Sequence, residues 1–127
     1  MDLKLDSREG FLLATAIGRV SLREAIEGYK KVCDLATEWG FDKVLIDCLA
    51  VEGELSDLER YGLGWAIAEY CRNQSISLKI ATVGKPPTIN GFAAQVASNR
   101  GLAAEAFPEL EPALEWLTGF CSKATAS

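Results

Sequence analysis

The stretch Lys43–Glu59, KVLIDCLAVEGELSDLE, decides the fold of this chain. Residues 43–49 are mostly apolar, which predicts a strand that is covered on both faces and is therefore central in a sheet. Gly53 then breaks the run, and Ser56 followed three residues later by Glu59 forms a capping box that opens a helix. A buried strand, a loop and a capped helix in this order are typical of an α/β domain.

The segments on either side continue this alternation. Leu3 and Leu5 alternate with charged residues, and Ser7–Gly10 supplies turn chemistry before the apolar run Phe11–Ile17, which predicts a β-hairpin. We expect helices at 21–39, 56–72, 90–101 and 110–121, and further strands at 76–83 and 102–107. The order ββαβαβαβα predicts an α/β fold with a mixed sheet flanked by helices, because strands separated by helices are parallel and the hairpin adds one antiparallel strand.

Length and charge restrict the domain count and the partners. The chain has 127 residues and is 49% apolar, so we expect a single domain at 1–121 and a flexible tail at 122–127. The net charge of −5 and the lack of a basic cluster disfavour nucleic acid and anionic membrane as partners. The start shows no signal-peptide pattern, and no apolar run approaches the roughly 20 residues of a membrane span, so we expect a cytoplasmic protein.

The residues that usually carry chemistry are scarce. The chain has no histidine, which removes the commonest general base and the usual partner of a Ser or Cys nucleophile. Its four cysteines are widely spaced and are expected to be buried thiols: Cys33, Cys48, Cys71 and Cys121. We therefore predict no catalytic residues, no metal site and no cofactor. An enzyme would have to use carboxylates alone, with Asp47, Glu52 and Glu54 as a paired acid and base.

Three motifs carry a resemblance to a known family. They are KVLIDCLAVEG at 43–53, ISLKIATVGKPP at 76–87 and EAFPELEPALEWL at 105–117. The order of elements over the whole chain resembles that of STAS domains, and the motifs are more closely similar to the SpoIIAA-like family of bacterial proteins. The resemblance implies a non-catalytic regulatory or scaffold module that binds a protein partner or itself.

The resemblance also points to a phosphorylation switch. In antagonists of the SpoIIAA type, a D-S-S-G-L stretch after the central strand carries a serine that a partner kinase phosphorylates. The matching region here reads GELSDL, in which Ser56 is the only serine. A phosphate there would meet the helix N-terminus favourably but would face Glu54, Asp57 and Glu59. Ser56 is therefore either a switch residue or only a helix cap.

A ligand site is expected where the central strands end. Open α/β sheets bind ligands beyond the carboxyl ends of their strands, which here are followed by loops 50–55 and 84–90. We expect the carboxylate of Asp47 to accept hydrogen bonds from backbone N–H groups of the next loop or to pair with Lys85, and ligand contact is the alternative. GKPPTING at 84–91 lacks the order of a phosphate-binding loop, although Lys85 could hold a small acidic metabolite. Asp47, Ser56 and Lys85 are thus a candidate switch or ligand group.

The helix that follows Ser56 is short of charge on its outside. In YGLGWAIAEYC, at 61–71, Glu69 is the only charged residue. Tyr61, Trp65 and Ala68 are candidate interface residues, and Gly62 and Gly64 would allow a second surface to approach closely. These features predict a homodimer or partner interface. The alternative is that the last helix or its loops cover this face within one chain.

A different function would use a pocket in place of a surface. Related α/β folds hold lipids between helices and sheet, so the alternative function is a carrier of a small apolar molecule or lipid. A cavity bounded by Phe11, Leu13, Trp65 and Phe92 would favour it.

Overall fold

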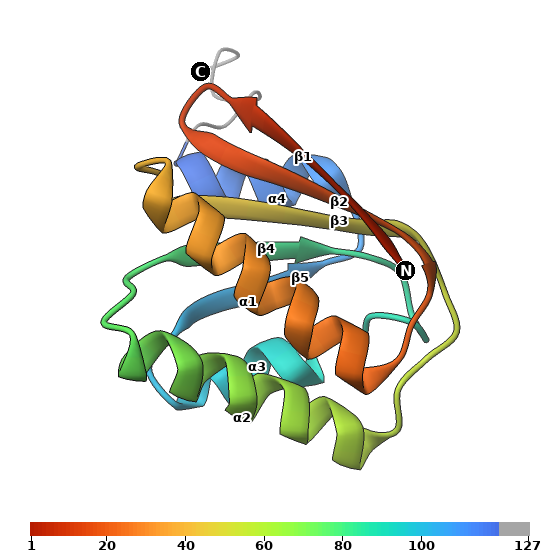
Figure 1. Ribbon diagram of the computed structural model, residues 1–127. Coiled ribbons are helices and arrows are strands. Elements are labelled where there is room, and N and C mark those ends of the chain that lie inside the picture. Colours follow the sequence, from red (N-terminus) through yellow and green to blue (C-terminus); the bar gives the residue numbers. More distant parts are fainter. Residues whose placement is uncertain (120–127) are drawn as a thin grey trace.

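The computed structural model describes residues 1–119. Residues 120–127, which include Cys121 and the expected tail, lie outside the described residues. The order ββαβαβαβα is confirmed (Figure 1). The elements are β1 (Asp2–Arg8), β2 (Phe11–Arg19), α1 (Leu22–Glu38), β3 (Lys43–Glu52), α2 (Asp57–Asn73), β4 (Lys79–Val83), α3 (Phe92–Asn99), β5 (Ala103–Phe107) and α4 (Leu110–Thr118).

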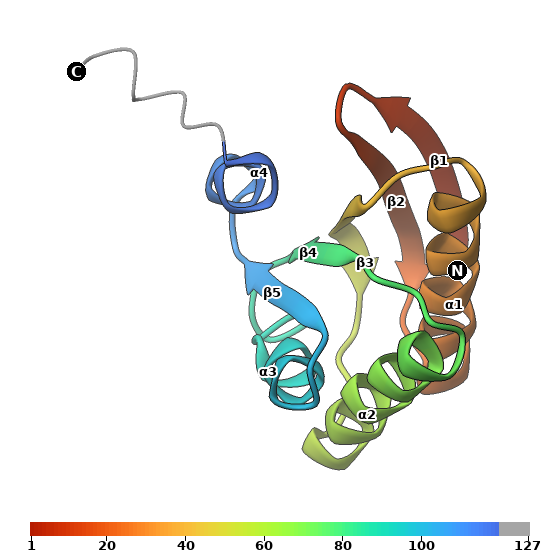
Figure 2. The same ribbon diagram turned by 90° about the vertical axis from the view of Figure 1, so that its left-hand side faces the viewer.

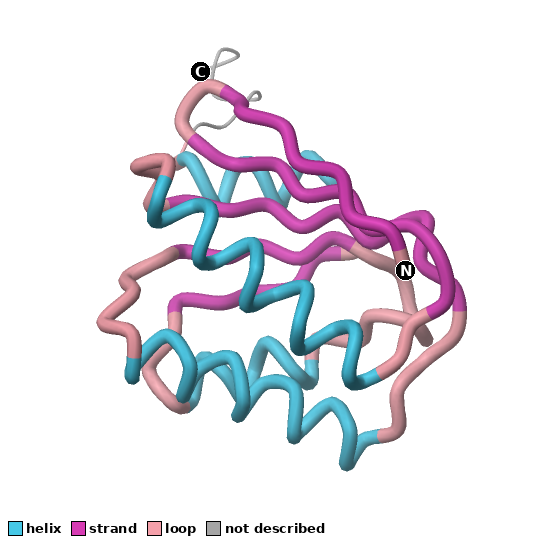
Figure 3. The backbone as a smooth tube through the Cα atoms, viewed as in Figure 1, coloured by secondary structure: helices cyan, strands magenta, loops and turns pink. Residues whose placement is uncertain are grey.

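The five strands form one mixed sheet in the order β1-β2-β3-β4-β5 (Figure 3). β1 is antiparallel to β2, and all other neighbours are parallel. β3 is the middle strand, as predicted, and Val44 pairs with Leu12 on one side and with Ile80 on the other. The opening hairpin therefore extends the sheet by one antiparallel edge strand. No helix within residues 1–119 is long and apolar enough to cross a membrane.

Both faces of the sheet are covered, but unequally. Helices α1, α2 and α3 lie on one face and α4 on the other (Figure 2). Successive side chains of a strand point to opposite faces, so Ile46 joins the α1–α3 side while Leu45 packs against Ala113 and Leu117 of α4. This explains why residues 43–49 show almost no polar alternation.

Three predicted boundaries are wrong for physical reasons. β3 runs on to Glu52 because β2 continues to pair with it as far as Arg19. β4 begins at Lys79, since the N–H of Ile76 donates to the carbonyl of Cys71 at 2.8 Å and so still belongs to the turn after α2. Gly91, with φ of 88°, is the N-cap of α3 in place of Asn90.

The two predicted capping boxes differ. At Ser56 the box is complete: the Ser56 hydroxyl accepts from the N–H of Glu59 at 3.1 Å, and the Glu59 carboxylate accepts from the N–H of Ser56 at 2.8 Å. At Ser21 only the hydroxyl acts as a cap, because the Glu24 carboxylate binds the terminal ammonium of Met1 at 2.8 Å. The start of the chain is thereby fixed to the first turn of α1.

Candidate functional site

The loops beyond the carboxyl ends of β3 and β4 contact each other. The Thr88 hydroxyl donates to the carbonyl of Gly53 at 2.7 Å. Nη2 of Arg60, in the first turn of α2, donates to the carbonyl of Pro87. We call residues 53–56 and 84–91 together the loop cover. The sequence placed these two loops at one edge of the sheet, and the structure joins them.

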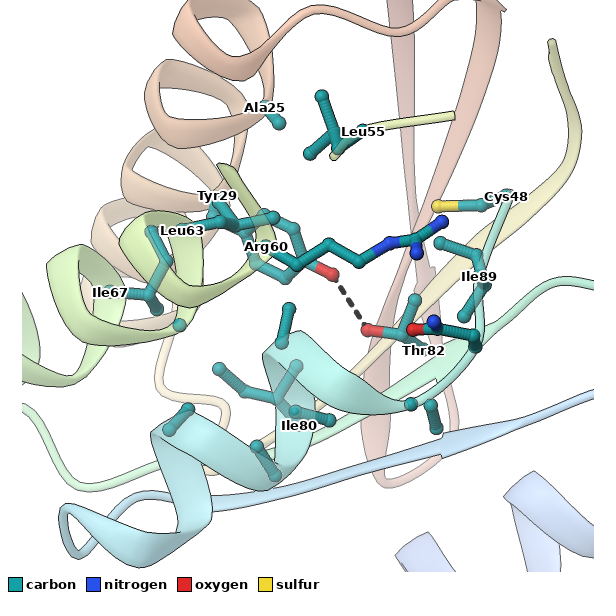
Figure 4. A pocket seen from close by; sticks show the side chains of 18 of the residues that line it. Ala25, Tyr29, Cys48, Leu55, Arg60, Leu63, Ile67, Ile80, Thr82 and Ile89 are labelled. Carbon is teal, nitrogen blue, oxygen red and sulfur yellow. Dashed lines mark hydrogen bonds between the residues drawn. The ribbon is translucent and has the colours of Figure 1, made fainter. Parts of the chain in front are cut away.

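A cavity of about 100 Å³ lies beneath the loop cover, between the sheet and helices α1, α2 and α3 (Figure 4). Its wall is mostly apolar and includes Leu63, Ile67 and Ile80. Its inner polar groups are the hydroxyls of Tyr29 and Thr82, which are 2.8 Å apart and hydrogen-bonded.

The predicted boundary of this cavity is wrong. Phe11, Leu13, Trp65 and Phe92 do not line it. Phe11 and Leu13 pack on the α4 side of the sheet, since their neighbours Leu12 and Ala14 are the residues of β2 that face α1 and α2. Trp65 and Phe92 are 43% and 38% exposed. The apolar run of β2 showed that both faces are buried but not which residues face which side.

Arg60 is the site residue that sequence reasoning missed. It is only 7% exposed, and its side chain extends along the edge of the cavity (Figure 4). Its guanidinium lies 3.4 Å from Oδ1 of Asp57 and 3.8 Å from Oε2 of Glu54. Helical spacing could have indicated that Arg60 faces inward. It precedes Leu63 and Ile67 by one and two helical turns, so it lies with them on the inner face of α2.

Two titratable groups of the cavity wall are protonated at neutral pH. Burial raises the pKa of the Tyr29 hydroxyl far above its usual value. Burial, assisted by the charge of Asp47, raises the pKa of the Cys48 thiol to about 12. A thiol with a raised pKa is mostly protonated near neutral pH and is a weak nucleophile.

The other described cysteines are also free thiols. Cys33 of α1 and Cys71 of α2 are buried, with their sulfur atoms 3.9 Å apart. The prediction of buried thiols is confirmed for these two residues, and Cys48 is partly buried. Within residues 1–119, no group of three or more His, Cys, Asp or Glu side chains could hold a metal ion.

Asp47 stabilises an irregularity in the central strand. Thr15 pairs with Asp47 but Ile17 pairs with Ala50, so β3 has an extra residue at this point and bulges. Oδ1 of Asp47 accepts a hydrogen bond from the N–H of Leu49, inside the bulge, at 2.9 Å. The predicted bond to backbone N–H is confirmed, although it lies within the strand and not in the next loop.

Replacing Asp47 with alanine should lower the free energy of unfolding by about 1 kcal/mol, because the N–H of Leu49 loses its acceptor. Leu49 is 49% exposed, so water compensates part of the loss. Asp47→Asn keeps an acceptor oxygen and should be nearly neutral. Urea unfolding of the two variants measures the difference, and an unchanged midpoint for Asp47→Ala would refute the structural role.

Ser56 and Lys85 are engaged in other contacts. The Ser56 hydroxyl belongs to the capping box of α2. Nζ of Lys85 lies 3.0 Å from Oε1 of Glu109 and donates to the carbonyl of Pro108 at 3.1 Å, so it ties the loop cover to the start of α4. Asp47, Ser56 and Lys85 thus have separate partners in this structure, and their roles as switch or ligand residues stay predictions.

The outer face of α2 exposes large apolar side chains. Leu58, Tyr61 and Trp65 are 81%, 48% and 43% exposed, and we call these three residues the α2 stripe. Ala68, which the sequence grouped with them, is only 4% exposed and belongs to the core.

Charged and small residues fix the surroundings of the α2 stripe. The guanidinium of Arg100 lies 5.2 Å from the ring centre of Trp65 and also binds Oε2 of Glu69 at 3.0 Å. Gly64 faces α3 of the same chain, where an added Cβ would collide with the carbonyl of Ala93. The second surface that Gly64 allows to approach closely is therefore α3 of the same chain, whereas Gly62 has open space around it.

Comparisons with known proteins identify the fold. No family model and no curated protein matches the sequence. An anti-sigma factor antagonist from Mycobacterium paratuberculosis superposes with a TM-score of 0.61 and 13% identity, over 92% of this chain and 93% of that one. An uncharacterised protein with a SpoIIAA-like fold from Shewanella loihica gives 0.53 and 18%, over 91% and 92%.

The anti-sigma factor antagonist SpoIIAA in its unphosphorylated form gives a TM-score of 0.53 and 12% identity, over 94% of this chain and 100% of that one. All three likenesses extend over nearly the full described chain at low sequence identity. The predicted SpoIIAA-like fold is thus confirmed as an architecture.

Proposed function

We propose that this chain, built on the SpoIIAA-like fold, is a non-catalytic regulatory module of the bacterial cytoplasm that binds a partner protein through the outer face of α2. Two of the structures with this fold are anti-sigma factor antagonists, which by their name act on another protein. Their fold supports a role in binding, and the α2 stripe supplies the surface.

The exposure of the α2 stripe is the observation that carries this proposal. Trp and Tyr are the residues most enriched among those that dominate binding energy at interfaces. Here both stand on one helix face beside Leu58, which is 81% exposed. The opposite face of α2 is buried against its own chain, so the helix is held rigidly and its outer side chains need little ordering on binding.

The charged residues around the α2 stripe indicate the surface chemistry that a partner protein should have. Glu54, Asp57 and Glu59 lie at the N-terminal end of α2, and the Glu54 and Asp57 side chains are 57% and 86% exposed. Arg60, the cation nearest to these carboxylates, is buried beneath them, and Arg100, beside Trp65, is paired with Glu69. A complementary surface would have an apolar groove bordered by Lys or Arg side chains.

The charge beside the α2 stripe favours a different protein over a second copy. Two copies that met at the N-terminal end of α2 would bring the carboxylates of Glu54, Asp57 and Glu59 of both copies together. A homodimer through the same face is the competing arrangement, and it is an outcome of the test.

Affinity capture from the native cell, followed by binding measurements with purified proteins, tests the proposal. We expect a captured protein that binds the purified chain directly at equal stoichiometry. Its affinity should fall as the salt concentration rises, because Glu54, Asp57 and Glu59 beside the α2 stripe take part in binding. Sedimentation of the chain alone should show a monomer. A stable dimer, or the lack of any direct binder, would contradict the proposal.

The carrier hypothesis receives specific support from the cavity beneath the loop cover, but its size limits the cargo. An engineered cavity of about 150 Å³ takes up benzene, and this one measures about 100 Å³. A lipid chain does not fit in that volume, whereas a small molecule does.

A further inference from the structure

We propose that the cavity beneath the loop cover is a binding site for a small, uncharged, mostly apolar molecule with one oxygen atom that accepts a hydrogen bond. This site is separate from the α2 stripe. The ligand would reach it from the edge of the sheet where β3 and β4 end, and it would contact α1, α2 and the sheet at once.

Volume and wall chemistry set the size and polarity of the ligand. The cavity of about 100 Å³ is smaller than the roughly 150 Å³ that holds a benzene ring. Leu55, Leu63 and Ile67 contribute apolar side chains to its wall. By proportion with the six non-hydrogen atoms of benzene, a compact molecule with about four non-hydrogen atoms matches the space, and most of its surface has to be apolar.

The hydroxyl pair on the inner wall supplies the polar contact. The hydroxyls of Tyr29 and Thr82 each carry one proton, and the bond between them uses only one of the two. Among residues 1–119, the second proton has no protein acceptor. Thr82 is 94% buried, since it is only 6% exposed. A ligand oxygen that accepts this proton would satisfy a buried donor.

The charges at the cavity edge favour an uncharged ligand over an anion. Arg60 and Met1, with its terminal ammonium, are the positively charged residues of the wall, and the ammonium is paired with Oε2 of Glu24 at 2.8 Å. The carboxylates of Asp57 and Glu54 lie 3.4 and 3.8 Å from the guanidinium of Arg60, which also donates to the carbonyl of Pro87. A third carboxylate would meet two existing negative charges and would have to lose its hydration. The positive charge of Arg60 is thus already balanced by carboxylates of the protein.

Methyl NMR titration with three matched probes tests the site. Acetone, isobutene and acetate each have four non-hydrogen atoms, but only acetone is both uncharged and an oxygen acceptor. We expect acetone to shift the methyl signals of Leu55, Leu63 and Ile67 and to bind roughly five-fold more tightly than isobutene, which lacks the oxygen. Acetate should leave these signals unchanged. Unshifted signals with acetone, or tighter binding of acetate, would overturn the proposal.

Two variants localise the contact. Tyr29→Phe/Thr82→Val replaces both hydrogen-bond partners with apolar groups of similar shape, which is nearly neutral for stability, and it should abolish the difference between acetone and isobutene. Ala104→Leu adds an isopropyl group to the cavity wall and should abolish binding of both, whereas the same change at exposed Ala103 should not. A five-fold preference that survives in the double variant would refute the role of the hydroxyl pair, whether or not Ala104→Leu folds.

Discussion

Replacing Gly64 with alanine is expected to lower the free energy of unfolding by about 3 kcal/mol. Gly64 lies where α2 crosses α3, and a Cβ at this position would lie 2.9 Å from Cβ of Val96 and closer still to the carbonyl oxygen of Ala93. Both obstacles belong to a packed helix, so the two helices would have to move apart. The loss of α2–α3 packing exceeds the gain in helix propensity, which is about 1 kcal/mol for this change.

Gly62 provides the matched control. It lies on the same helix two residues earlier, and an added Cβ would have no neighbour within 4 Å. Gly62→Ala should therefore stabilise the protein by up to about 1 kcal/mol, because alanine loses less backbone entropy than glycine in a helix. Urea unfolding of both variants measures the two changes. Effects of the same sign would show that the crossing of α2 and α3 is described incorrectly.

This pair of glycines shows where sequence reasoning stopped. The sequence correctly indicated that glycines in α2 allow close approach, but it could not show that the approaching surface at Gly64 is α3 of the same chain. Ala68 was misplaced for a related reason. Without the position of α3, the apolar side chains around α2 do not reveal which of them face inward.

The order of elements was predictable because local signals agreed with each other. The apolar run at 43–49 and the box of Ser56 and Glu59 specify a central strand and a capped helix, and both are present. The burial of Arg60 was not expected, since charged residues are rarely inside unless they are paired. Its partners, Glu54 and Pro87, become neighbours only when the two loops meet.

The cavity was predictable in kind but not in composition. The rule that ligands bind beyond strand ends selected the two loops that meet over the cavity. The side chains that enclose the space, such as Tyr29 and Thr82, are 53 residues apart in the sequence and meet through the register of the sheet and the packing of α1. No local pattern carries that information.

Replacing Trp65 with glutamate is expected to weaken binding of the partner protein by at least roughly 30-fold, the effect of losing a central aromatic contact worth 2 kcal/mol or more. The change replaces the largest apolar side chain of the α2 stripe with a negative charge. It should leave the fold intact, because Trp65 is 43% exposed. The variant also loses the contact of Trp65 with Arg100, whose guanidinium keeps its ion pair with Glu69.

Trp39 provides the control for this variant. It is 49% exposed and follows the end of α1, outside the α2 stripe. Trp39→Glu therefore makes the same chemical change at a similarly exposed tryptophan. Thermal unfolding should confirm that both variants are folded, so that any difference in binding reports on the surface.

The dissociation constant of the purified partner, measured by calorimetry for the wild type, Trp65→Glu and Trp39→Glu, tests the account most directly. We predict a loss of roughly 30-fold or more for Trp65→Glu and less than about two-fold for Trp39→Glu. Equal affinities for the two variants, or a larger loss for Trp39→Glu, would contradict the assignment of partner binding to the outer face of α2.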